Sequence, residues 1–488
     1  MPFSLLSQSV VKVADLQFSK QVVDSVWLSN PAMQDGLYHS SFYDLQLKLN
    51  RWKHSKLNNP IHGNKSNTWQ LNIESYNIKN NTTLFSKVYY KKGNTENVQW
   101  NNVDLIEEIG PYWVADTTKG TNEFEHYFFN GGIAHRFEKL TLAIEGSFLA
   151  KILYKTVNPR VKNISNSIRI VPGIKYNTSR YSSGFSIGFE SYKQDSDTRI
   201  YDDSGRKDFF YMLEGLGYYD YKLSQTASSY GIYYAMQKWS ANMQIRPIVK
   251  GIYANILFQQ SINEMGMSDI IPNIYRFENI HFKAGWQNKT DNSEFRLGLK
   301  GEHRKGNGKE RVYETVIIEP NTDLTDKRLL TESDNYSKKT DVLTLEAMLS
   351  SKRQVKVKYI LKAFYQMGQY NEDYLDVSVL KYNFNKWQVK SYIQYHLNDS
   401  FIEFVASYLN YNTTNASLKG LPDTKVSSDL ILPYFQFISA AYSQYQFEFK
   451  YNYQLRNSST ICLALKYENA NSTQINNQQT SIHLAYIF

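Results

Sequence analysis

The chain has 488 residues, of which 42 % are hydrophobic, 15 % aromatic and 21 % charged, and its formal net charge is +9. It holds no apolar run of about 18 residues, which excludes a transmembrane helix. Its lysines and arginines are dispersed rather than clustered, which argues against a nucleic-acid-binding face. The length permits either two or three soluble domains or one large all-β structure.

The first 40 residues differ from the rest of the chain because they show no strand-like period. Residues 1–9 lack a basic start and have too short an apolar core for a complete secretory signal, so we interpret them as a residual signal-peptide segment. We expect the mature chain to begin between Gln8 and Val10. Residues 10–40 form a lead-in with a loop near Pro31, since the residue before proline avoids the helical region.

From Ser41 onwards, apolar and polar residues alternate, which predicts β-strands because successive strand side chains point to opposite faces. The clearest alternating segments are 41–52, 69–73, 84–90, 140–148, 168–176, 185–189, 280–286, 295–299, 343–349, 355–361, 387–395, 445–455, 461–467 and 480–488. Counting segments of this kind predicts about sixteen strands, within a range of roughly fourteen to eighteen, because bacterial membrane barrels have even strand numbers.

The connections between these segments favour a membrane barrel over a soluble sandwich or propeller. Short links such as Asn80–Thr82 alternate with long polar ones such as Lys53–Ser66, whereas a sandwich has turns at a regular spacing of about 8–12 residues. Tyr445–Leu455 alternates strictly over a length that crosses a bilayer as a tilted strand, about 9–11 residues. The sequence therefore predicts an all-β, transmembrane antiparallel β-barrel with long extracellular loops and short periplasmic turns.

Charged residues occupy the polar face of the predicted strands. A charge on the lipid side of a barrel costs about 2–4 kcal/mol at the midplane, so this face is assigned to the lumen. The predicted lumen-lining charges are Lys48, Glu145, Lys283, Arg296, Glu346, Lys356, Lys358, Lys362, Glu448 and Lys450. Such a mixed interior fits a lumen that is crosslinked by ion pairs and partly filled, and it also fits a weakly anion-favouring, water-filled pore.

Four long connections are the candidate functional regions: Gly93–Thr121, Gln194–Lys222, Arg304–Lys339 and Asn398–Ser428. Loops longer than about 12–15 residues are usually functional or disordered. These are too apolar to float freely, so we expect them to pack on each other, plug the lumen or dock a partner. The alternative is that they only shield the mouth. We expect Val312–Ile318 to form an external hairpin.

No motif in the chain predicts catalysis, a cofactor or a bound metal. Gly184–Gly188 matches the G-x-S-x-G nucleophile elbow, but it lies inside an alternating strand rather than at a strand-to-helix turn. The histidines are scattered, and no zinc spacing, phosphate-binding loop or calcium loop is present. Four aspartates could bind a calcium ion together with backbone oxygens: Asp195, Asp197, Asp202 and Asp203. We favour the interpretation that they form a solvated acidic loop.

Both ends of the chain carry resemblances to known families. The last strand has apolar and aromatic residues at alternate positions, Ile482, Leu484, Tyr486 and Phe488. This pattern resembles the terminal strand of bacterial outer-membrane β-barrels, where such residues form an assembly signal that the barrel-assembly machinery recognises. The Asn30–Ala32 segment resembles the N-terminus of the long-chain fatty-acid transporter barrels, and that resemblance implies a segment packed inside the lumen.

Together with the Trp27–Pro31 lead-in, these features resemble a Bacteroidota outer-membrane β-barrel family without assigned function. The resemblance implies an outer-membrane location, contact with outer-membrane lipids and lipopolysaccharide, and association with a TonB-dependent transporter and surface lipoproteins. It divides the chain into a residual signal segment (1–9), a periplasmic or lumen-plugging lead-in (10–40) and a transmembrane barrel (41–488).

Three functions follow as hypotheses. The first is a subunit or accessory of a nutrient or iron uptake complex or another surface complex, which predicts a plugged lumen and partners. The second is a freestanding porin-like diffusion channel for small solutes, which predicts an open lumen. The third is a hydrolase at the rim, which predicts a histidine and a carboxylate within hydrogen-bonding distance at the base of a loop. We expect a protein that is not an enzyme and that binds no nucleic acid.

Overall fold

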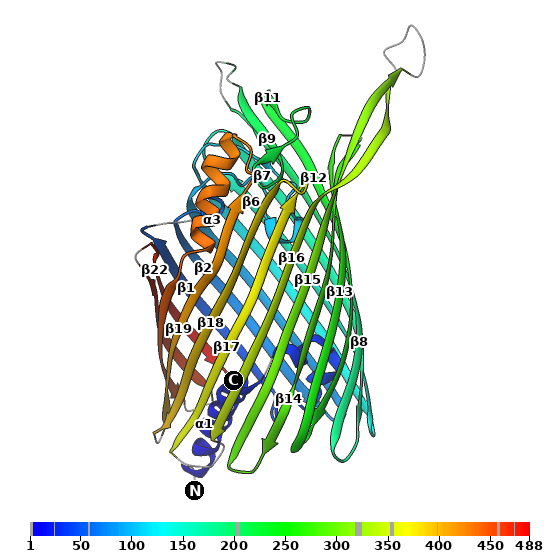
Figure 1. The fold of residues 1–488 in the computed structure, drawn as a ribbon. Coiled ribbons are helices and arrows are strands. Elements are labelled where there is room, and N and C mark those ends of the chain that lie inside the picture. Colours follow the sequence, from blue (N-terminus) through cyan, green and yellow to red (C-terminus); the bar gives the residue numbers. More distant parts are fainter. Residues whose placement is uncertain are drawn as a thin grey trace.

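Eighteen antiparallel strands form one closed barrel (Figure 1). The structure is a computed structural model that describes residues 3–23, 25–56, 59–201, 205, 207–268, 270–317, 325–351, 356–397, 399–455, 459–472 and 474–488. Each barrel strand pairs with the next one along the chain, and β22 pairs with β1 to close the wall. The expectation of a closed antiparallel barrel is therefore confirmed.

The barrel strands are β1 (Phe42–His54), β2 (Lys65–Lys79), β3 (Thr82–Val98), β5 (Gly120–Phe137), β6 (Leu140–Lys155), β7 (Arg160–Asn177), β8 (Tyr181–Arg199), β12 (Ser229–Pro247), β13 (Lys250–Met267), β14 (Ile270–Lys289), β15 (Ser293–Ile317), β16 (Thr325–Ser351), β17 (Val357–Tyr374), β18 (Ser378–His396), β19 (Ser400–Lys419), β20 (Tyr442–Gln454), β21 (Thr460–Asn471) and β22 (Asn476–Ile487).

Short elements fill the two ends of the barrel. The N-terminal ones are α1 (Phe3–Val22), η1 (Ser25–Ser29) and η2 (Pro31–Gln34). Those in the connections are η3 (Pro60–His62), α2 (Ile106–Ile109), β4 (Val114–Ala115), β9 (Asp208–Gly215), β10 (Tyr218–Tyr219), β11 (Gln225–Ala227), η4 (Ser427–Ile431) and α3 (Leu432–Ile438). In the described part of the chain, no helix is both long and apolar enough to span a membrane.

The outer wall of the barrel is an apolar belt. On β1, Leu47 and Leu49 are 38 % and 47 % exposed, whereas the lumen-facing Asp44 is 1 % exposed. Leu47 lies opposite Leu71 of β2 and Leu484 of β22, so the belt continues across the seam where the barrel closes. A contiguous exposed apolar band of this kind marks contact with a membrane rather than with water.

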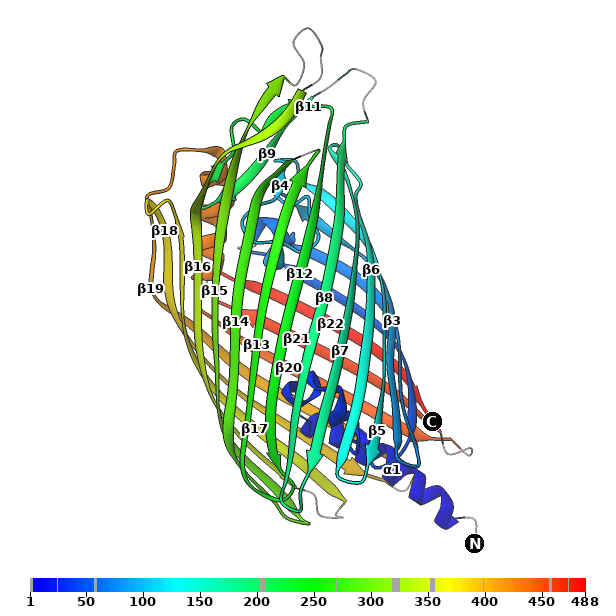
Figure 2. The same ribbon diagram turned by 90° about the vertical axis from the view of Figure 1, so that its right-hand side faces the viewer.

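The two ends of the barrel differ. Both termini and the short connections lie at one end, which we call the terminal end (Figure 2). The connections at the opposite end, the loop end, include the three long segments 99–119, 200–228 and 420–441. The loop end therefore carries most of the irregular chain.

The strand number is eighteen, where counting alternating segments predicted about sixteen. Asn398–Ser428, predicted as a long loop, is largely β19, a full strand of the wall. Its outward row is apolar at Phe404 but polar further along, at Asn412 and Thr414, because the strand continues beyond the apolar belt. The alternation that predicts a strand is therefore weak over half of its length.

Arg304–Lys339, also predicted as a loop, consists of the far halves of β15 and β16, which pair as far as Ile317 and Thr325. These halves project beyond the rim as a hairpin (Figure 1). The external hairpin expected at Val312–Ile318 is thus the outer part of two wall strands. The residues between Ile317 and Thr325 lie outside the described part of the chain.

The N-terminal segment, residues 3–40, enters the barrel at the terminal end, with the start of α1 projecting beyond the wall, and we call it the plug (Figure 2). Its second half is held by Asn30, whose Nδ2 donates to the carbonyl oxygens of Ile174 (2.9 Å) and Phe185 (3.3 Å). A Cβ on Gly173 or Gly184 would come within 2.2 and 2.6 Å of the Asn30 side chain. The two glycines therefore provide the space that lets this asparagine reach the wall.

Ion pairs hold the plug at further points. Lys175 Nζ lies 2.8 Å from Asp35 Oδ2, and both side chains are buried. Lys20 Nζ contacts Asp44 (2.9 Å) and Glu74 (2.8 Å) on the wall. A buried charge that loses its partner is strongly destabilising, so these pairs fix where the plug sits.

We expect Asn30→Ala to loosen the plug, because two wall carbonyls and the Ala32 amide lose their partner in a buried site. Leaving such groups unsatisfied costs about 1–3 kcal/mol, so amide hydrogen exchange in residues 25–40 should rise about tenfold. Asn77→Ala on the outer wall is the matched control. Unchanged exchange in Asn30→Ala would contradict the anchoring role.

Candidate functional site

Three long connections meet at the loop end and close the mouth of the barrel. They are residues 99–119 with α2 and β4, residues 200–228 with β9 to β11, and residues 420–441 with η4 and α3. Strand β9 pairs with β4, β10 and β11 in a small sheet of its own. The loops therefore pack on one another and on the wall.

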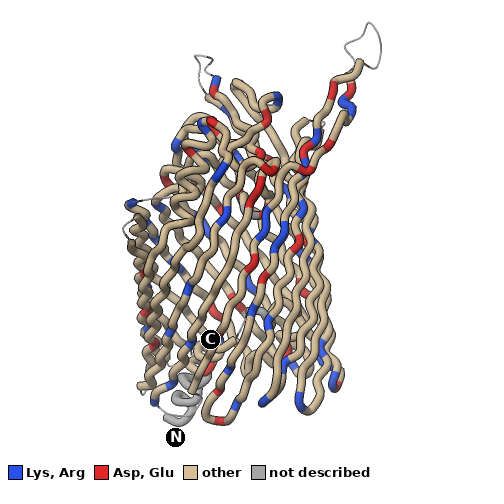
Figure 3. Tube along the Cα trace, viewed as in Figure 1, with Lys and Arg blue, Asp and Glu red and all other residues tan. Residues whose placement is uncertain are grey.

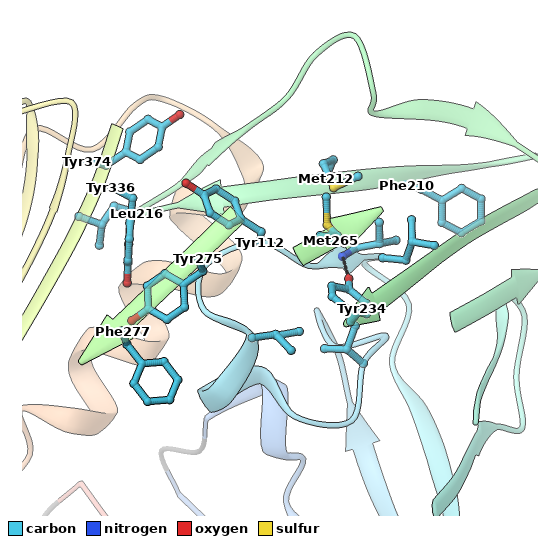
Figure 4. Packing of buried hydrophobic residues seen from close by; sticks show 14 of the residues in the cluster. Tyr112, Phe210, Met212, Leu216, Tyr234, Met265, Tyr275, Phe277, Tyr336 and Tyr374 are labelled. Atoms are coloured by element: carbon cyan, nitrogen blue, oxygen red, sulfur yellow. Dashed lines mark hydrogen bonds between the residues drawn. The ribbon is translucent and has the colours of Figure 1, made fainter. Parts of the chain in front are cut away.

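The apolar core beneath these loops is rich in tyrosine and methionine (Figure 4). Phe210 and Met212 of β9 are fully buried in it. Tyr112 from the first loop packs toward Tyr336 on the wall, with 6.5 Å between ring centroids. Tyr234 Oη accepts from the Val114 amide at 3.3 Å, which ties the wall to β4. Burial of this much aromatic surface holds the loops in the mouth.

A cavity of about 290 Å³ remains between the loops and the wall, and we call it the outer pocket. Its lining comes from η3 in the β1–β2 connection, from the loop segments 106–113 and 213–218, from the wall strands β14, β16, β17 and β18, and from the loop helices η4 and α3. The principal lining side chains are Ile61, His62, Leu213, Leu216, Tyr275, Tyr336, Lys338, Tyr370, Glu372, Leu380, Leu430, Ile431 and Tyr434.

Polar groups in the outer pocket are few and held in place. Glu372 accepts from Tyr336 Oη at 2.9 Å and from Tyr370 Oη at 2.5 Å. The Lys338 ammonium lies 5.1 Å from the centre of the Tyr370 ring. An apolar concavity with a few convergent polar groups is the usual form of a small-molecule site.

A pair of carboxyl groups fastens the second loop to the wall close to this pocket. Tyr374 Oη lies 2.9 Å from Glu214 Oε2 on β9 and 3.2 Å from Glu310 Oε2 on β15. The single hydroxyl proton of Tyr374 cannot be donated fully to both carboxylates at once. Burial, together with the nearby charge of Glu310, raises the pKa of Glu214 to about 8. We call Glu214, Glu310 and Tyr374 the carboxyl latch.

A second cavity, of about 410 Å³, lies deeper in the lumen, and we call it the inner chamber. The plug contributes Val22 and Val23 to its lining. The wall contributes mainly charged and amide side chains: Lys283, Arg296, Lys300, Glu346, Lys362, Gln366, Lys386 and Gln388.

Most of the predicted lumen charges lie on the inner face of the wall. Positive and negative residues are interspersed along the strands (Figure 3). Five of them, Lys283, Arg296, Glu346, Lys358 and Lys362, contact the plug or line the inner chamber. The other inner ones are Lys48, Glu145, Glu448 and Lys450. Lys356 differs, because it precedes β17 and is exposed at the connection.

The residues predicted to form an assembly signal lie on the outer wall of β22 and just beyond it. Ile482, Leu484 and Phe488 are exposed, and Tyr486 is half-buried with its hydroxyl 2.8 Å from Ser459 Oγ. Phe488 hydrogen-bonds with the Tyr43 backbone in both directions, and its ring stacks on the Tyr43 ring. The final aromatic therefore takes part in the closing seam.

The G-x-S-x-G match has a packing explanation. Gly184 leaves room for Asn30, and Ser186 Oγ donates to the Ser29 carbonyl oxygen at 3.4 Å. Both residues thus face the plug. In the described ranges, no three His, Cys, Asp or Glu side chains are arranged to hold a metal ion.

The outer pocket was not predicted from the sequence. Its wall tyrosines point inward from parts of the strands that lie beyond the apolar belt. There the outward residues are no longer apolar, so the sequence does not distinguish the inner face from the outer face. The usable signal was aromatic residues at lumen-facing positions next to long connections, as at Tyr336 and Tyr370.

The architecture defines a large closed β-barrel of the outer-membrane type. The chain belongs to DUF6850, a family of unknown function whose model matches residues 31–488. The comparison with curated proteins finds no match.

Solved structures with a similar fold include receptors and channels. BauA, the ferric preacinetobactin receptor from Acinetobacter baumannii, is 7 % identical with a TM-score of 0.40, over 92 % of this chain and 80 % of that one. A Pseudomonas aeruginosa FadL homologue is 9 % identical with a TM-score of 0.35, over 95 % and 93 %. The TodX monoaromatic hydrocarbon channel, in a deltaS2 mutant, is 10 % identical with a TM-score of 0.33, over 95 % and 93 %.

We expect the loop at β9 to loosen as pH rises. The Glu214 carboxyl has a pKa of about 8 when the latch is closed and an ordinary value of 4.5. Once the loop is free the carboxyl ionises at lower pH, so the closed state loses stability between about pH 4.5 and 8 and then levels off. Exchange in residues 208–215, corrected for intrinsic rates, should be up to about 100-fold faster at pH 9 than at pH 6.

Glu214→Gln removes the ionisable group but keeps the shape, so it should abolish this pH dependence. Glu332→Gln on the exposed part of β16 is the matched control and should keep it. An equal pH dependence in Glu214→Gln and in the wild type would contradict the latch.

Proposed function

We propose that this chain is a bacterial outer-membrane uptake barrel that is closed at rest and that binds a small, mostly apolar solute in the outer pocket. The supporting observation is the outer pocket itself, an apolar, tyrosine-lined cavity enclosed by loops above a plugged lumen. A barrel with a structural role alone does not need such a cavity.

The proposed orientation places the terminal end in the periplasm and the loop end outside the cell. Short turns with both termini on one side and long loops on the other are typical of outer-membrane barrels. The apolar belt between the two ends supplies the lipid contact. In this orientation the outer pocket faces the medium from which a solute would arrive.

The lining of the pocket indicates the chemistry of its ligand. Aromatic rings prefer to pack against other rings at centroid distances of about 4.5–7 Å, and Tyr275, Tyr336 and Tyr370 present such surfaces. The volume of about 290 Å³ suits a small molecule of roughly one or two rings. Lys338 and Glu372 supply polar contacts that would orient it.

The plug argues against the freestanding porin. A diffusion channel requires an open lumen, whereas here the plug packs against the inner wall from Val13 onward and the three loops pack in the mouth at the other end. Passage through the barrel therefore requires the plug to move.

Membership in a larger assembly is the second candidate function, and a separate observation favours it. The β15–β16 hairpin projects beyond the rim and exposes Ile317 (63 %), Leu329 (43 %) and Leu330 (59 %). Exposed apolar residues on a projecting hairpin suit a protein partner. We propose a TonB-dependent transporter or a surface lipoprotein of a Bacteroidota nutrient-uptake system as that partner.

We expect a panel of small aromatic solutes to raise the melting temperature of the wild-type protein in nanodiscs. A ligand at 100 times its Kd stabilises a protein by about 2.7 kcal/mol. Leu216→Trp fills the outer pocket and should abolish the shift, whereas Leu375→Trp, at an exposed position on the rim, should retain it. Absence of any shift in the wild type, or an undiminished shift in Leu216→Trp, would contradict the proposal.

The assembly is tested by purification from native membranes in a mild detergent. The wild type should bring down a TonB-dependent transporter or lipoprotein in stoichiometric amount, and Leu329→Asp with Leu330→Asp should reduce this at least about tenfold, because charge replaces apolar contact. Leu375→Asp, in the β17–β18 connection, is the control. Recovery of the barrel alone would argue against the assembly.

A further inference from the structure

The inner chamber is strongly cationic. Five of its lining side chains are Lys or Arg, and one, Glu346, is a carboxylate among the described lining residues. Glu346 contacts Lys283, so that pair is locally neutral. Arg296 Nε donates to Glu294 Oε1 at 2.6 Å, which balances a second charge. The chamber therefore keeps a net positive charge.

Two of these cations hold the end of α1. Lys362 Nζ donates to the Gln21 carbonyl oxygen at 2.7 Å, and Arg296 Nη1 donates to the Val22 carbonyl oxygen at 3.0 Å. The last carbonyls of a helix have no partner within the helix and carry about half a negative charge together. The C-terminal end of α1 thus occupies the position that an anion would take on Arg296 and Lys362.

The remaining cations exceed what holding the plug requires. Lys300 and Lys386 line the chamber, and within the described residues neither forms a hydrogen bond or an ion pair. Unpaired ammonium groups around a partly enclosed space are costly unless water or an anion compensates them. Their placement beside Lys362 and Arg296 points to a ligand rather than to structure alone.

We propose that the inner chamber binds an oxyanion group, carboxylate or phosphate, and that this binding releases the plug. A full negative charge makes stronger hydrogen bonds to Arg296 and Lys362 than the helix carbonyls do, so it competes with α1 for the same donors. The inference rests on the proposed uptake function and deepens it: the solute carries an apolar body for the outer pocket and an oxyanion for the inner chamber.

The test uses the full-length chain in nanodiscs and two probes, inorganic phosphate and benzoate, with ionic strength held constant by sodium chloride. Calorimetry measures the Kd, and hydrogen exchange in residues 10–23 measures release of α1. We expect saturable binding of at least one probe and about tenfold faster exchange when it is bound. Tighter binding of benzoate would identify a carboxylate solute, and tighter binding of phosphate a phosphorylated one.

Lys300→Met and Lys386→Met remove charge without touching the plug, so both should fold. Each should weaken binding about tenfold, the effect of losing one charge-assisted contact. Lys466→Met is the control. Lys466 does not line the chamber and pairs with Glu468 at 3.0 Å, so this variant should bind the probes as the wild type does.

Three results would overturn the inference: no binding of either probe, binding that Lys300→Met and Lys386→Met leave unchanged, or binding without faster exchange in α1. Each can occur while aromatic solutes still stabilise the wild type through the outer pocket. Failure of this inference is therefore distinguishable from failure of the proposed function.

Discussion

Closure of the wall is the constraint on which the rest of the structure depends. An eighteen-stranded barrel encloses more space than its own inward side chains fill, since filling by side chains alone is reached near eight strands. The remaining volume must hold water or chain. Here the same polypeptide fills it from both ends, with the plug at the terminal end and three loops at the other.

The plug and the three loops are held in the barrel by different interactions, and the two cavities differ in chemistry as a result. The plug is held by ion pairs, by Asn30 and by apolar contacts of α1 with the wall, where Leu16, Phe18 and Val22 are buried. The loops are held by buried aromatic surface and by the carboxyl latch. An apolar pocket therefore lies at the entrance and a cationic chamber lies against the plug. In the proposed uptake function, a solute would meet apolar contacts first and charged contacts second.

Much of the barrel could be predicted from the sequence, because lipid on one face and lumen on the other impose a period of two. Tyr445–Leu455 shows this period without interruption and corresponds to β20. Strands that extend beyond the belt, such as β19, lose the period and were missed. Helix α1 was also missed, since a helix packed inside a mixed lumen needs no single apolar stripe. Of the ten predicted lumen charges, all except Lys356 stand on the inner face, but their partners were not predictable from the sequence. The contact of Lys362 with Gln21, for example, joins positions 341 residues apart.

The most direct test of a lumen closed at rest is single-channel recording in planar bilayers with purified wild-type protein and with Asn30→Ala. We expect the wild type to insert without a steady conductance, because the plug packs in the lumen at one end and the loops pack in the mouth at the other. Asn30→Ala, with its plug loosened, should show frequent openings. A steady, large conductance of the wild type would contradict the closed lumen and would favour a freestanding porin.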